Sequence, residues 1–431
     1  MKTTFFIRDA AKFVGKDVEI KGWVYNKRSS GKIHFLQLRD GSGFIQGIVV
    51  KSEVSSESFA AAEKVTIESS ILARGIIRED KRAPDGYELT VKELEIIRLA
   101  DEFPIGKKEH GPDFLLSNRH LWLRSKRQWA ILRIRNQLIL AINEYLQKNG
   151  FLRVDTPIIT PSACEGTTTL FEIDYFGEKA YLTQSGQLYL EAAIGSVGRC
   201  YDFGPVMRAE KSKTRRHLIE FWMMDAEAAF VDFDAILKIE EELIYHITQS
   251  VLVNCEKELQ ILERDMTFLK QIKIPFPRIT YLEAVKTLNS LGSDIKVGSD
   301  FGNDDETILM NHFLSPIFVT HYPAEVKAFY VKRDSKDKSY ALSADLLAPE
   351  GYGEIIGGGE REDDYQILLD EIKLRNIDMK DYDWYLDLRK YGSVPHSGFG
   401  IGLERMVAWL CKLPHVRETI PFPRLLGRFR P

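Results

Sequence analysis

Alternating hydrophobic and polar residues predict that the first hundred residues form a series of short β-strands. This two-residue period is typical of half-buried strands. Five such runs occur, with one helical segment after the third: strands 18–25, 33–39, 44–50, 70–77 and 87–99, and helix 55–64. Asp40-Gly41-Ser42-Gly43 predicts a tight hairpin turn. The order predicts a five-stranded oligonucleotide-binding β-barrel over residues 1–100, although other small barrels share parts of it.

A polar segment and a long amphipathic helix follow the predicted barrel. Residues 101–120 are interrupted by glycine and proline, which predicts a linker or hinge. From residue 125 to 148, apolar side chains recur at intervals of three and four residues, and Asn149-Gly150 is a typical helix end. A helix this long with one apolar face either covers a core or joins a second subunit.

The remaining residues, 121–431, predict one α+β domain. Strand-like segments turn at residues 176–178 and again between residues 208 and 217, and helices fit 187–197 and about 233–260. Successive hairpins require an antiparallel sheet, because parallel pairing needs a crossover between strands. The pattern therefore predicts an antiparallel sheet flanked by helices. The stretch from about 260 to 306 is too weakly patterned for a prediction.

Composition adds few constraints. The 431 residues carry a net charge of −4, so any nucleic acid must be bound by local basic patches. The four cysteines are scattered without metal-ligand spacing, which favours a reducing compartment: Cys164, Cys200, Cys255 and Cys411. We find no secretory leader and no apolar run of membrane-spanning length. These features predict a cytoplasmic enzyme without a membrane partner.

The densest candidate motif lies between two strand-like segments. Five cations and one histidine fall between Arg208 and His217. Most charge runs of this kind are solvated hairpin tips. Arg208 and Phe221, however, fall inside the predicted strands, where a guanidinium can fork onto a phosphate while the facing ring stacks on a base.

A glycine-rich segment forms a second candidate motif. Glu354 lies in an apolar strand that runs into Gly357-Gly358-Gly359, and the pattern predicts a helix start at residues 360–362. In one interpretation the glycines only serve a tight turn. In the other, the backbone approaches a ligand, and Glu354 with Asp345 offers carboxylate oxygens to Mg²⁺.

A third candidate motif alternates glycines along an extended segment. Gly398, Gly400 and Gly402 precede an amphipathic helix whose first turn carries Arg405. A cation in the first turn opposes the helix dipole. The arrangement therefore predicts that an anion binds beside Arg405.

In this order, the segments resemble the three signature motifs of class II aminoacyl-tRNA synthetases. The first motif would be the helix over 125–148 with the segment up to Pro157. It forms the dimer interface in that family, so the resemblance implies a homodimer. Residues 208–221 and 398–405 resemble the second and third motifs. The N-terminal barrel is typical of the aspartyl, asparaginyl and lysyl subgroup.

Residues 182–190 distinguish the members of this subgroup. The aspartyl enzymes carry Ser-Pro-Gln-Leu-Tyr-Lys here, and the lysine pairs with the substrate carboxylate, whereas this chain has Gly186 and Leu190. A leucine would leave a buried carboxylate unpaired, so an uncharged amide suits the pocket better. The sequence is thus similar to the asparaginyl members, as are residues 353–358 and 391–400. The resemblance implies ATP-dependent activation of L-asparagine and its transfer to tRNA(Asn).

The resemblance also implies roles for individual residues. Arg208 would hold the α-phosphate of ATP, Phe221 and Arg405 would enclose the adenine, Glu210 would hold its amino group, and His217 the outer phosphates. Glu354 would act with Arg208 and Arg405 in catalysis, and Asp345 with Glu354 would hold Mg²⁺. The amino-acid ligands would be Glu165, Ser185, Gln187, Asp225, Glu227 and Arg361. Glu227 could instead pair with a structural arginine or lysine.

For the barrel, the resemblance implies contacts with the tRNA anticodon. Phe35 would stack on an unpaired base, and Arg39 and Gln46 would reach base edges or phosphates. A lone aromatic in a strand is, without the resemblance, more often a core residue. Three alternatives remain open: an aspartyl enzyme that accepts one or both tRNAs, a synthetase-like asparagine synthetase, and a non-catalytic RNA-binding paralogue. The last should have lost Arg208, Glu354 or Arg405.

Overall fold

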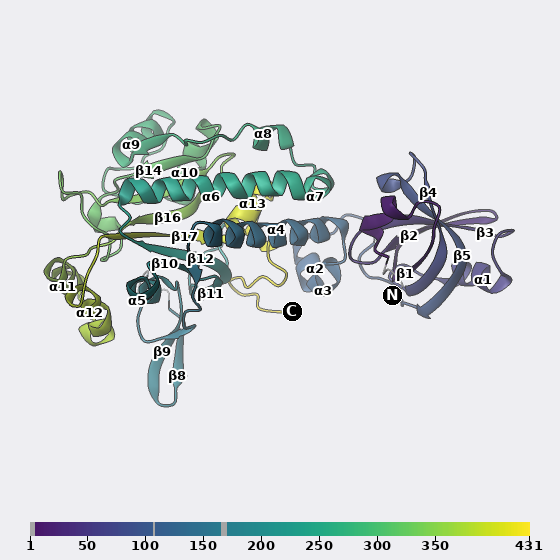
Figure 1. The fold of residues 1–431 in the computed structure, drawn as a ribbon, viewed down its shortest axis with the longest axis horizontal. Helices are drawn as coiled ribbons and strands as arrows, with labels where there is room; N and C mark the ends of the chain where they lie inside the picture. Colours follow the sequence, from purple (N-terminus) through teal and green to yellow (C-terminus); the bar gives the residue numbers. More distant parts are fainter. Residues whose placement is uncertain (1–4, 107, 165–169) are drawn as a thin grey trace. The chain divides into compact units, whose positions relative to one another are not determined.

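The computed structural model describes residues 5–106, 108–164 and 170–431. The chain divides into two compact units, Met1–Pro112 and Asp113–Pro431 (Figure 1). Residues 113–120 of the predicted linker therefore belong to the second unit, where they contribute to α2 (Pro112–Ser117) and α3 (Arg119–Trp122). No helix within the described ranges is both long and apolar enough to cross a membrane.

The first unit is a closed five-stranded barrel with strand order β1-β2-β3-β5-β4, as the alternation predicts. Its elements are η1 (Ile7–Phe13), β1 (Asp17–Ser30), β2 (Ile33–Arg39), β3 (Phe44–Val50), α1 (Ser56–Lys64), β4 (Ser70–Glu79), η2 (Pro84–Gly86) and β5 (Tyr87–Arg98). Along β2 the inward side chains are Leu36 and Leu38, and the outward ones include Phe35. The alternation thus separates a packed interior from an outer face that is available for binding.

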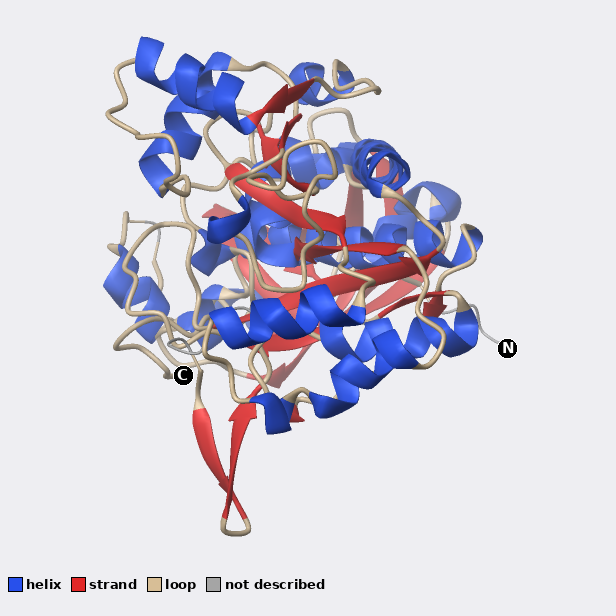
Figure 2. Ribbon diagram, turned by 90° about the vertical axis from the view of Figure 1, so that its left-hand side faces the viewer, coloured by secondary structure: helices blue, strands red, loops and turns tan. Residues whose placement is uncertain are grey.

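The second unit is built on a large sheet between helices (Figure 2). Its strand order is β13-β14-β15-β16-β17-β12-β10-β6, with β11 beside β12. The outer pairs β13–β14 and β10–β6 are parallel and the other pairs are antiparallel, which confirms the predicted α+β domain. The strands are β6 (Leu152–Arg153), β10 (Arg199–Tyr201), β11 (Gly204–Met207), β12 (Glu220–Ala229), β13 (Arg278–Thr280), β14 (Ile317–Thr320), β15 (Ser343–Ala348), β16 (Gly353–Glu360) and β17 (His396–Gly402).

Two long helices, α4 (Lys126–Lys148) and α6 (Phe233–Asn254), lie side by side along this sheet (Figure 1). The side chain of Ser125 caps α4 by accepting from the Gln128 amide, and its apolar stripe lies in the main core. The remaining helices are α5 (Gln187–Val197), α7 (Glu256–Ile261), α8 (Met266–Lys270), α9 (Tyr281–Ser290), α10 (Asn303–His312), η4 (Ala324–Val326), α11 (Tyr365–Leu374), η5 (Met379–Asp381), α12 (Asp383–Lys390), α13 (Leu403–Leu410) and η6 (Val416–Glu418).

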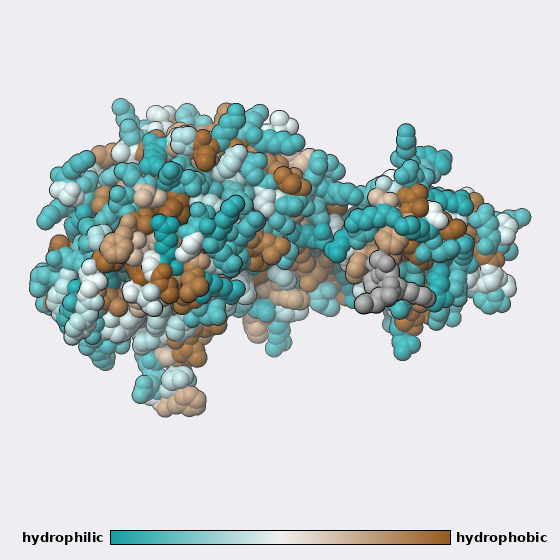
Figure 3. Space-filling view, in the orientation of Figure 1, coloured by the Kyte–Doolittle hydropathy of each residue, from teal (hydrophilic) through white to brown (hydrophobic). Residues whose placement is uncertain are grey.

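The predicted hairpin at residues 171–182 forms a small sheet with β7 (Ile159–Thr160): β8 (Glu172–Tyr175) and β9 (Glu178–Leu182) project from the body (Figures 1 and 2). Its turn exposes Phe176 almost completely, at 94%, and Figure 3 shows apolar surface at its tip. The prediction of a helix start at residues 360–362 is wrong. The glycines lie inside β16, and α11 begins only at Tyr365, because cross-strand pairing continues through Gly359 with β15 and through Glu360 with β17.

Candidate active site

Bare glycines face carboxylates across the central strands of the large sheet. Asp225 and Glu227 on β12 pair in register with Gly400 and Gly398 on β17. A methyl group at Gly398 would overlap the Glu227 carboxylate, and one at Gly400 would lie 2.6 Å from an oxygen of Asp225. The alternating glycines therefore provide room for buried carboxylates on the neighbouring strand.

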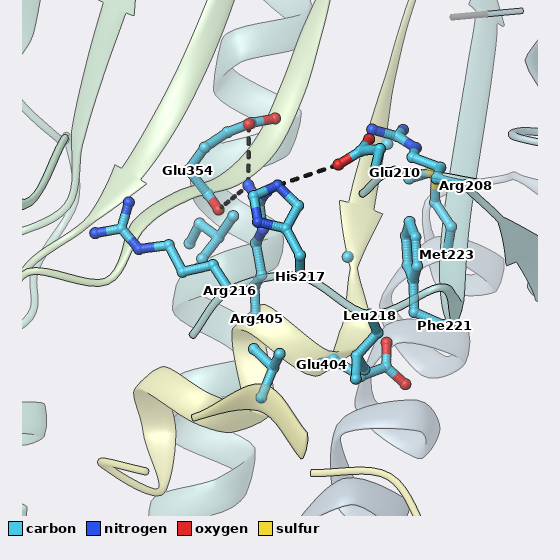
Figure 4. Close-up of a pocket in the computed structure, with 14 residues that line it drawn as sticks. Arg208, Glu210, Arg216, His217, Leu218, Phe221, Met223, Glu354, Glu404 and Arg405 are labelled. Atoms are coloured by element: carbon cyan, nitrogen blue, oxygen red, sulfur yellow. Dashed lines mark hydrogen bonds and ion pairs between the residues drawn. The ribbon is translucent and has the colours of Figure 1, made fainter. Parts of the chain in front are cut away.

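The predicted ATP ligands surround one pocket (Figure 4). The guanidinium carbon of Arg208 lies 5.5 Å from the centre of the Phe221 ring, as expected for neighbours across a hairpin. Nη1 of Arg405 donates to the Glu354 carboxylate at 3.0 Å and to its carbonyl at 2.9 Å. Burial alone would raise the pKa of Glu354, yet Arg405, Lys327 and Arg208 hold it below its ordinary value. Glu354 is therefore an ionised oxygen donor.

Glu210 and His217 contact each other in this structure instead of pointing to separate ligands. Nε2 of His217 lies 3.3 Å from a Glu210 oxygen, and the Thr214 hydroxyl contacts Nδ1. Burial and the nearby Arg405 lower the pKa of His217, while Glu210 opposes the shift. The roles predicted for this pair, at the adenine and at the outer phosphates, require the contact to open.

Two residues of this pocket region were missed by sequence reasoning. Arg216 is buried and donates to the Glu306 carboxylate, the Thr307 hydroxyl and the Gly351 carbonyl, each at 2.6 Å. Glu306 lies in the first turn of α10, at the end of the stretch that is too weakly patterned for a prediction from the sequence. Its carboxylate also accepts a hydrogen bond from the Glu354 amide at 3.0 Å. No local signal could reveal a pair separated by 90 residues.

The predicted amino-acid ligands meet at the start of α5. The Asp225 carboxylate accepts from the Ser185 hydroxyl at 2.8 Å and from the Gly186 amide at 2.9 Å. A side chain at Gly186 would overlap the buried carboxyl of Asp202. This explains why glycine stands here. Gln187 lines the same cavity and donates to Glu191 at 3.0 Å.

Arg361 and Glu227 form a buried ion pair. Nη2 and Nε of Arg361 donate to one oxygen of Glu227 at 2.6 and 3.1 Å. Both interpretations of Glu227 therefore hold in part, since its arginine partner is itself a predicted substrate ligand. The sequence-based placement of Leu190 in the amino-acid pocket is wrong. Leu190 packs against Ile194 and Cys200, and charged side chains form the floor instead.

The predicted magnesium ligands converge across a glycine. A methyl group at Gly357 would lie 3.1 Å from an oxygen of Glu354 and 3.7 Å from one of Asp345. Lys327 donates to both oxygens of Asp345, at 2.8 and 2.9 Å. Burial raises the pKa of Asp345 to about 6 although Lys327 opposes the rise. Two converging carboxylates are the donor type that Mg²⁺ requires.

Among the described residues, Glu191, Glu227 and His396 have ligand atoms within 4.8 Å of one another. Arg389 and Arg361 already pair with the two carboxylates, at 2.7 and 2.6 Å. A metal ion would have to displace both guanidinium groups. We therefore interpret this group as an ion-pair cluster. Glu165, the remaining predicted ligand, lies outside the described residues.

The barrel separates the three predicted anticodon ligands. Phe35 lies on the outer face, with the Arg28 guanidinium 4.4 Å from its ring centre, so it is not a core residue. Gln46 lies on the same face of the neighbouring strand. Arg39 is buried and donates to Glu68 through Nη2 at 2.6 Å. This pair assigns Arg39 to the frame of the barrel instead of an RNA contact.

Most of the predicted groups line one cavity of about 500 Å³ in the second unit. Its lining includes the predicted ATP ligands Arg208, His217, Glu354 and Arg405 and the predicted amino-acid ligands Ser185, Gln187, Asp225 and Arg361. An antiparallel sheet that carries the predicted phosphate and amino-acid ligands in this order is typical of the catalytic domain of a class II aminoacyl-tRNA synthetase. Residues 111–426 match the family of class II tRNA synthetases (D, K and N), and residues 18–97 match the OB-fold nucleic acid binding domain.

Comparison with known proteins identifies the family within this class of synthetases. The chain is 58% identical to an asparagine–tRNA ligase from Desulforamulus reducens and 53% identical to one from Pelotomaculum thermopropionicum, over 99% of each chain. Its structure is similar to that of asparaginyl-tRNA synthetase from Pyrococcus horikoshii complexed with asparaginyl-adenylate, with a TM-score of 0.96, 46% identity and full coverage of both chains. The chain therefore belongs to the asparagine–tRNA ligase family.

Proposed function

We propose that this protein activates L-asparagine with ATP to asparaginyl-adenylate and transfers the asparaginyl group to the 3′ end of tRNA(Asn). The observation that carries this proposal is the single cavity in which Arg208, Arg405 and Arg361 converge. Activation is an in-line displacement at the α-phosphate, for which a protein needs chiefly to position the reactants and neutralise developing charge. The site supplies groups for both tasks.

In this mechanism, Arg208 forks onto the α-phosphate and stabilises the charge of the five-coordinate transition state. Phe221 stacks on one face of the adenine and Arg405 lies over the other. Glu354 orients Arg405 through their hydrogen bond. Asp345 and Glu354 would hold Mg²⁺, which supplies charge neutralisation for the phosphates. Asp225, fixed by Ser185, receives the α-ammonium group together with Gln187.

The Arg361–Glu227 pair supports asparagine over aspartate as the substrate. Asparagine can donate its amide hydrogens to Glu227 and accept from Arg361 through its carbonyl oxygen. The negative charge of an aspartate side chain would repel the negative charge of Glu227. Arg361 would not fully offset this repulsion, because it already donates to the Glu227 carboxylate at 2.6 Å. Sites built around one buried hydrogen bond discriminate by factors of about 10⁴ or more. The pair therefore permits strict selection without a separate editing step.

ATP–pyrophosphate exchange with each of the twenty amino acids tests this function. We expect asparagine to support exchange about 10³-fold or more above any other amino acid, because Glu227 accepts only from a donor. Equal exchange with aspartate would assign the chain to the aspartyl enzymes. Exchange with none would favour a non-catalytic paralogue.

The outer face of the barrel supports tRNA binding through Phe35 and Gln46. Phe35→Ala is expected to raise the KM for tRNA about tenfold while asparagine-dependent pyrophosphate exchange stays at the parent level. Stacking of one base on an aromatic ring contributes roughly 1–3 kcal/mol. Ile97→Ala, which removes another exposed apolar side chain of the barrel, is the matched control and should leave KM unchanged. An unaltered tRNA KM in Phe35→Ala would remove the stacking role.

Exposed apolar side chains support a homodimer. Leu140 on α4 and Leu152 on β6 are each 54% exposed, and Ile158 and Ile159 are each 44% exposed. Leu140 and Leu152 belong to the segment that resembles the first signature motif, and Ile158 and Ile159 follow it directly in the sequence. A second copy of this chain is the occupant that we propose for this surface. We also propose a cytoplasmic location, which the four cysteines support, because all are buried and none forms a disulfide.

A further inference from the structure

A buried cluster of charges lies next to the Arg361–Glu227 pair and has no part in the proposed chemistry. Its centre is Glu191 on α5, whose side chain is fully buried. One Glu191 oxygen accepts from the Tyr385 hydroxyl and from Nη2 of Arg389, both at 2.7 Å, and lies 3.0 Å from Nε2 of His396. The other accepts from Gln187. The cluster thus connects the cavity wall to α12 and β17.

The geometry around His396 specifies its charge. Nδ1 lies 2.8 Å from the Val394 carbonyl oxygen, which can only accept, so Nδ1 must carry a proton. Nε2 faces the carboxylate of Glu191, which is held ionised by its donors, so Nε2 must carry a proton as well. A neutral imidazole would leave one nitrogen lone pair against an acceptor. His396 is therefore a buried imidazolium.

The pKa shifts agree with this geometry. Burial alone would lower the pKa of His396, but the hydrogen bond and charge of Glu191 outweigh it, and the pKa lies above its ordinary value. Burial also opposes ionisation of Glu191, but Arg389 and His396 hold its pKa far below the usual range. The two groups form a charged pair at neutral pH.

Glu227 is the group on which this cluster acts. Arg361 faces it directly, Glu191 faces it from α5 and His396 from β17, with Arg389 behind Glu191 on α12. Cys200 on β10 pairs with it in register, but burial and the charge of Glu227 raise the pKa of that thiol to about 12, so it carries no charge. Burial raises the pKa of Glu227 to about 7, and Glu191 adds to the rise, whereas Arg361 and His396 oppose it. When His396 is charged, the cluster contains three cations, Arg361, Arg389 and His396, and two carboxylates, Glu191 and Glu227. Protonation of Glu227 would leave Glu191 as the one anion among three cations, and the cations therefore oppose it.

We infer that His396 is a positioning residue for amino-acid selection: its imidazolium shifts Glu227 toward the ionised form, in which Glu227 only accepts hydrogen bonds and the pocket disfavours aspartate. The inference rests on the proposed function. A protonated Glu227 could donate its own hydrogen to an aspartate carboxylate, and the like-charge conflict would vanish. Selection of asparagine should therefore weaken under conditions that protonate Glu227.

The wild-type protein gives the first test. The ratio of kcat/KM for aspartate to that for asparagine, measured by pyrophosphate exchange between pH 6 and 8.5, should rise as the pH falls through about 7, the pKa of Glu227. Taking the ratio cancels pH effects that are common to both substrates. A ratio that is constant over this range would overturn the inference, whereas absence of asparagine-dependent exchange would instead overturn the proposed function.

His396→Gln gives the second test. Without the imidazolium charge, Glu227 binds its proton more tightly, so the rise should move to higher pH by at least about one unit, giving a roughly tenfold higher aspartate ratio at pH 7.5. In Glu227→Gln the ratio should be independent of pH. Adding His396→Gln to that variant should then leave the profile flat.

A merely structural His396 predicts other results. It would lower exchange with both amino acids equally and leave the pH profile of the ratio in place, or would shift the ratio equally in the Glu227→Gln background. If the variants do not fold, the ¹⁵N chemical shifts of the His396 ring in the intact protein decide the question. Protonated signals from both nitrogens at pH 7.5 support the inference, and a neutral ring overturns it.

Discussion

Arg208→Ala is expected to lower asparagine-dependent ATP–pyrophosphate exchange by about 10³-fold without a comparable loss of stability. Removing one preorganised donor from a developing negative charge typically costs about 10²–10³ in rate, and a guanidinium supplies two donors and a full charge. Arg208 reaches the cavity from the strand end beside Phe221, and the Arg208 amide, which the substitution retains, donates to the Ile219 carbonyl across the hairpin. Exchange kinetics and a thermal melt of the same preparation measure the two effects.

Two further variants make the Arg208 result specific. Arg208→Lys keeps the charge but not the fork, and should recover only part of the lost rate. Lys213→Ala removes an exposed cation from the same basic segment and should change exchange by less than about threefold. If Lys213→Ala were as damaging as Arg208→Ala, the segment would act through its total charge and the role of Arg208 would have to be withdrawn.

Gly398→Ala is expected to lower kcat/KM for asparagine by about 10²-fold or more. The added methyl group would overlap the Glu227 carboxylate, so Glu227 and its partner Arg361 must move. A displacement of about 1 Å in a positioned ligand can cost about 10²-fold in rate. Overpacking of this kind also destabilises by about 1–3 kcal/mol, which a thermal melt would detect.

Gly402→Ala is the matched variant on the same strand. The nearest atom to its methyl group is Cγ of Arg405, at 4.0 Å, so the fold has room for it. Gly402 lines the ATP pocket, and the methyl group should raise the KM for ATP while the KM for asparagine stays near the parent value. The same substitution at two alternate glycines should therefore affect different substrates. An equal effect of both on one substrate would contradict the assignment of Gly398 to the amino-acid ligands and of Gly402 to the ATP ligands.

The sequence alone was sufficient for the barrel and for α4, whereas the helix predicted over about 233–260 is divided at Cys255 into α6 and α7. Alternation along 33–39 separates Leu36 and Leu38 from Phe35, and the structure follows it. The period of three and four residues over 125–148 predicts α4, and the predicted apolar stripe is buried, together with the polar side chains of Gln128 and Arg135. These predictions hold because burial of one face is a local property of a periodic segment.

Local pattern was insufficient where strands and charges meet. The glycines at 357–359 suggest a turn, yet β15 and β17 hold them in a strand. Arg39 suggests an RNA contact, but Glu68, distant in sequence, neutralises it. Leu190 suggests an apolar floor, but α5 turns it away and presents Glu191 to Arg389 and His396. In each case the deciding partner comes from a separate element.

The sequence by itself determined the element types of the barrel, the antiparallel character of the second domain, the order of the three motifs and the residue types that can hold ATP, magnesium and an amino acid. Only the tertiary structure decided which carboxylate faces which glycine, that Glu227 is paired with Arg361, and that Glu306 and Glu191 belong beside the site. The physical reason is the distance along the chain over which each effect acts. Periodicity and turn preference act within one segment, whereas the charge and protonation of a buried group depend on side chains that the sheet brings together from distant parts of the chain.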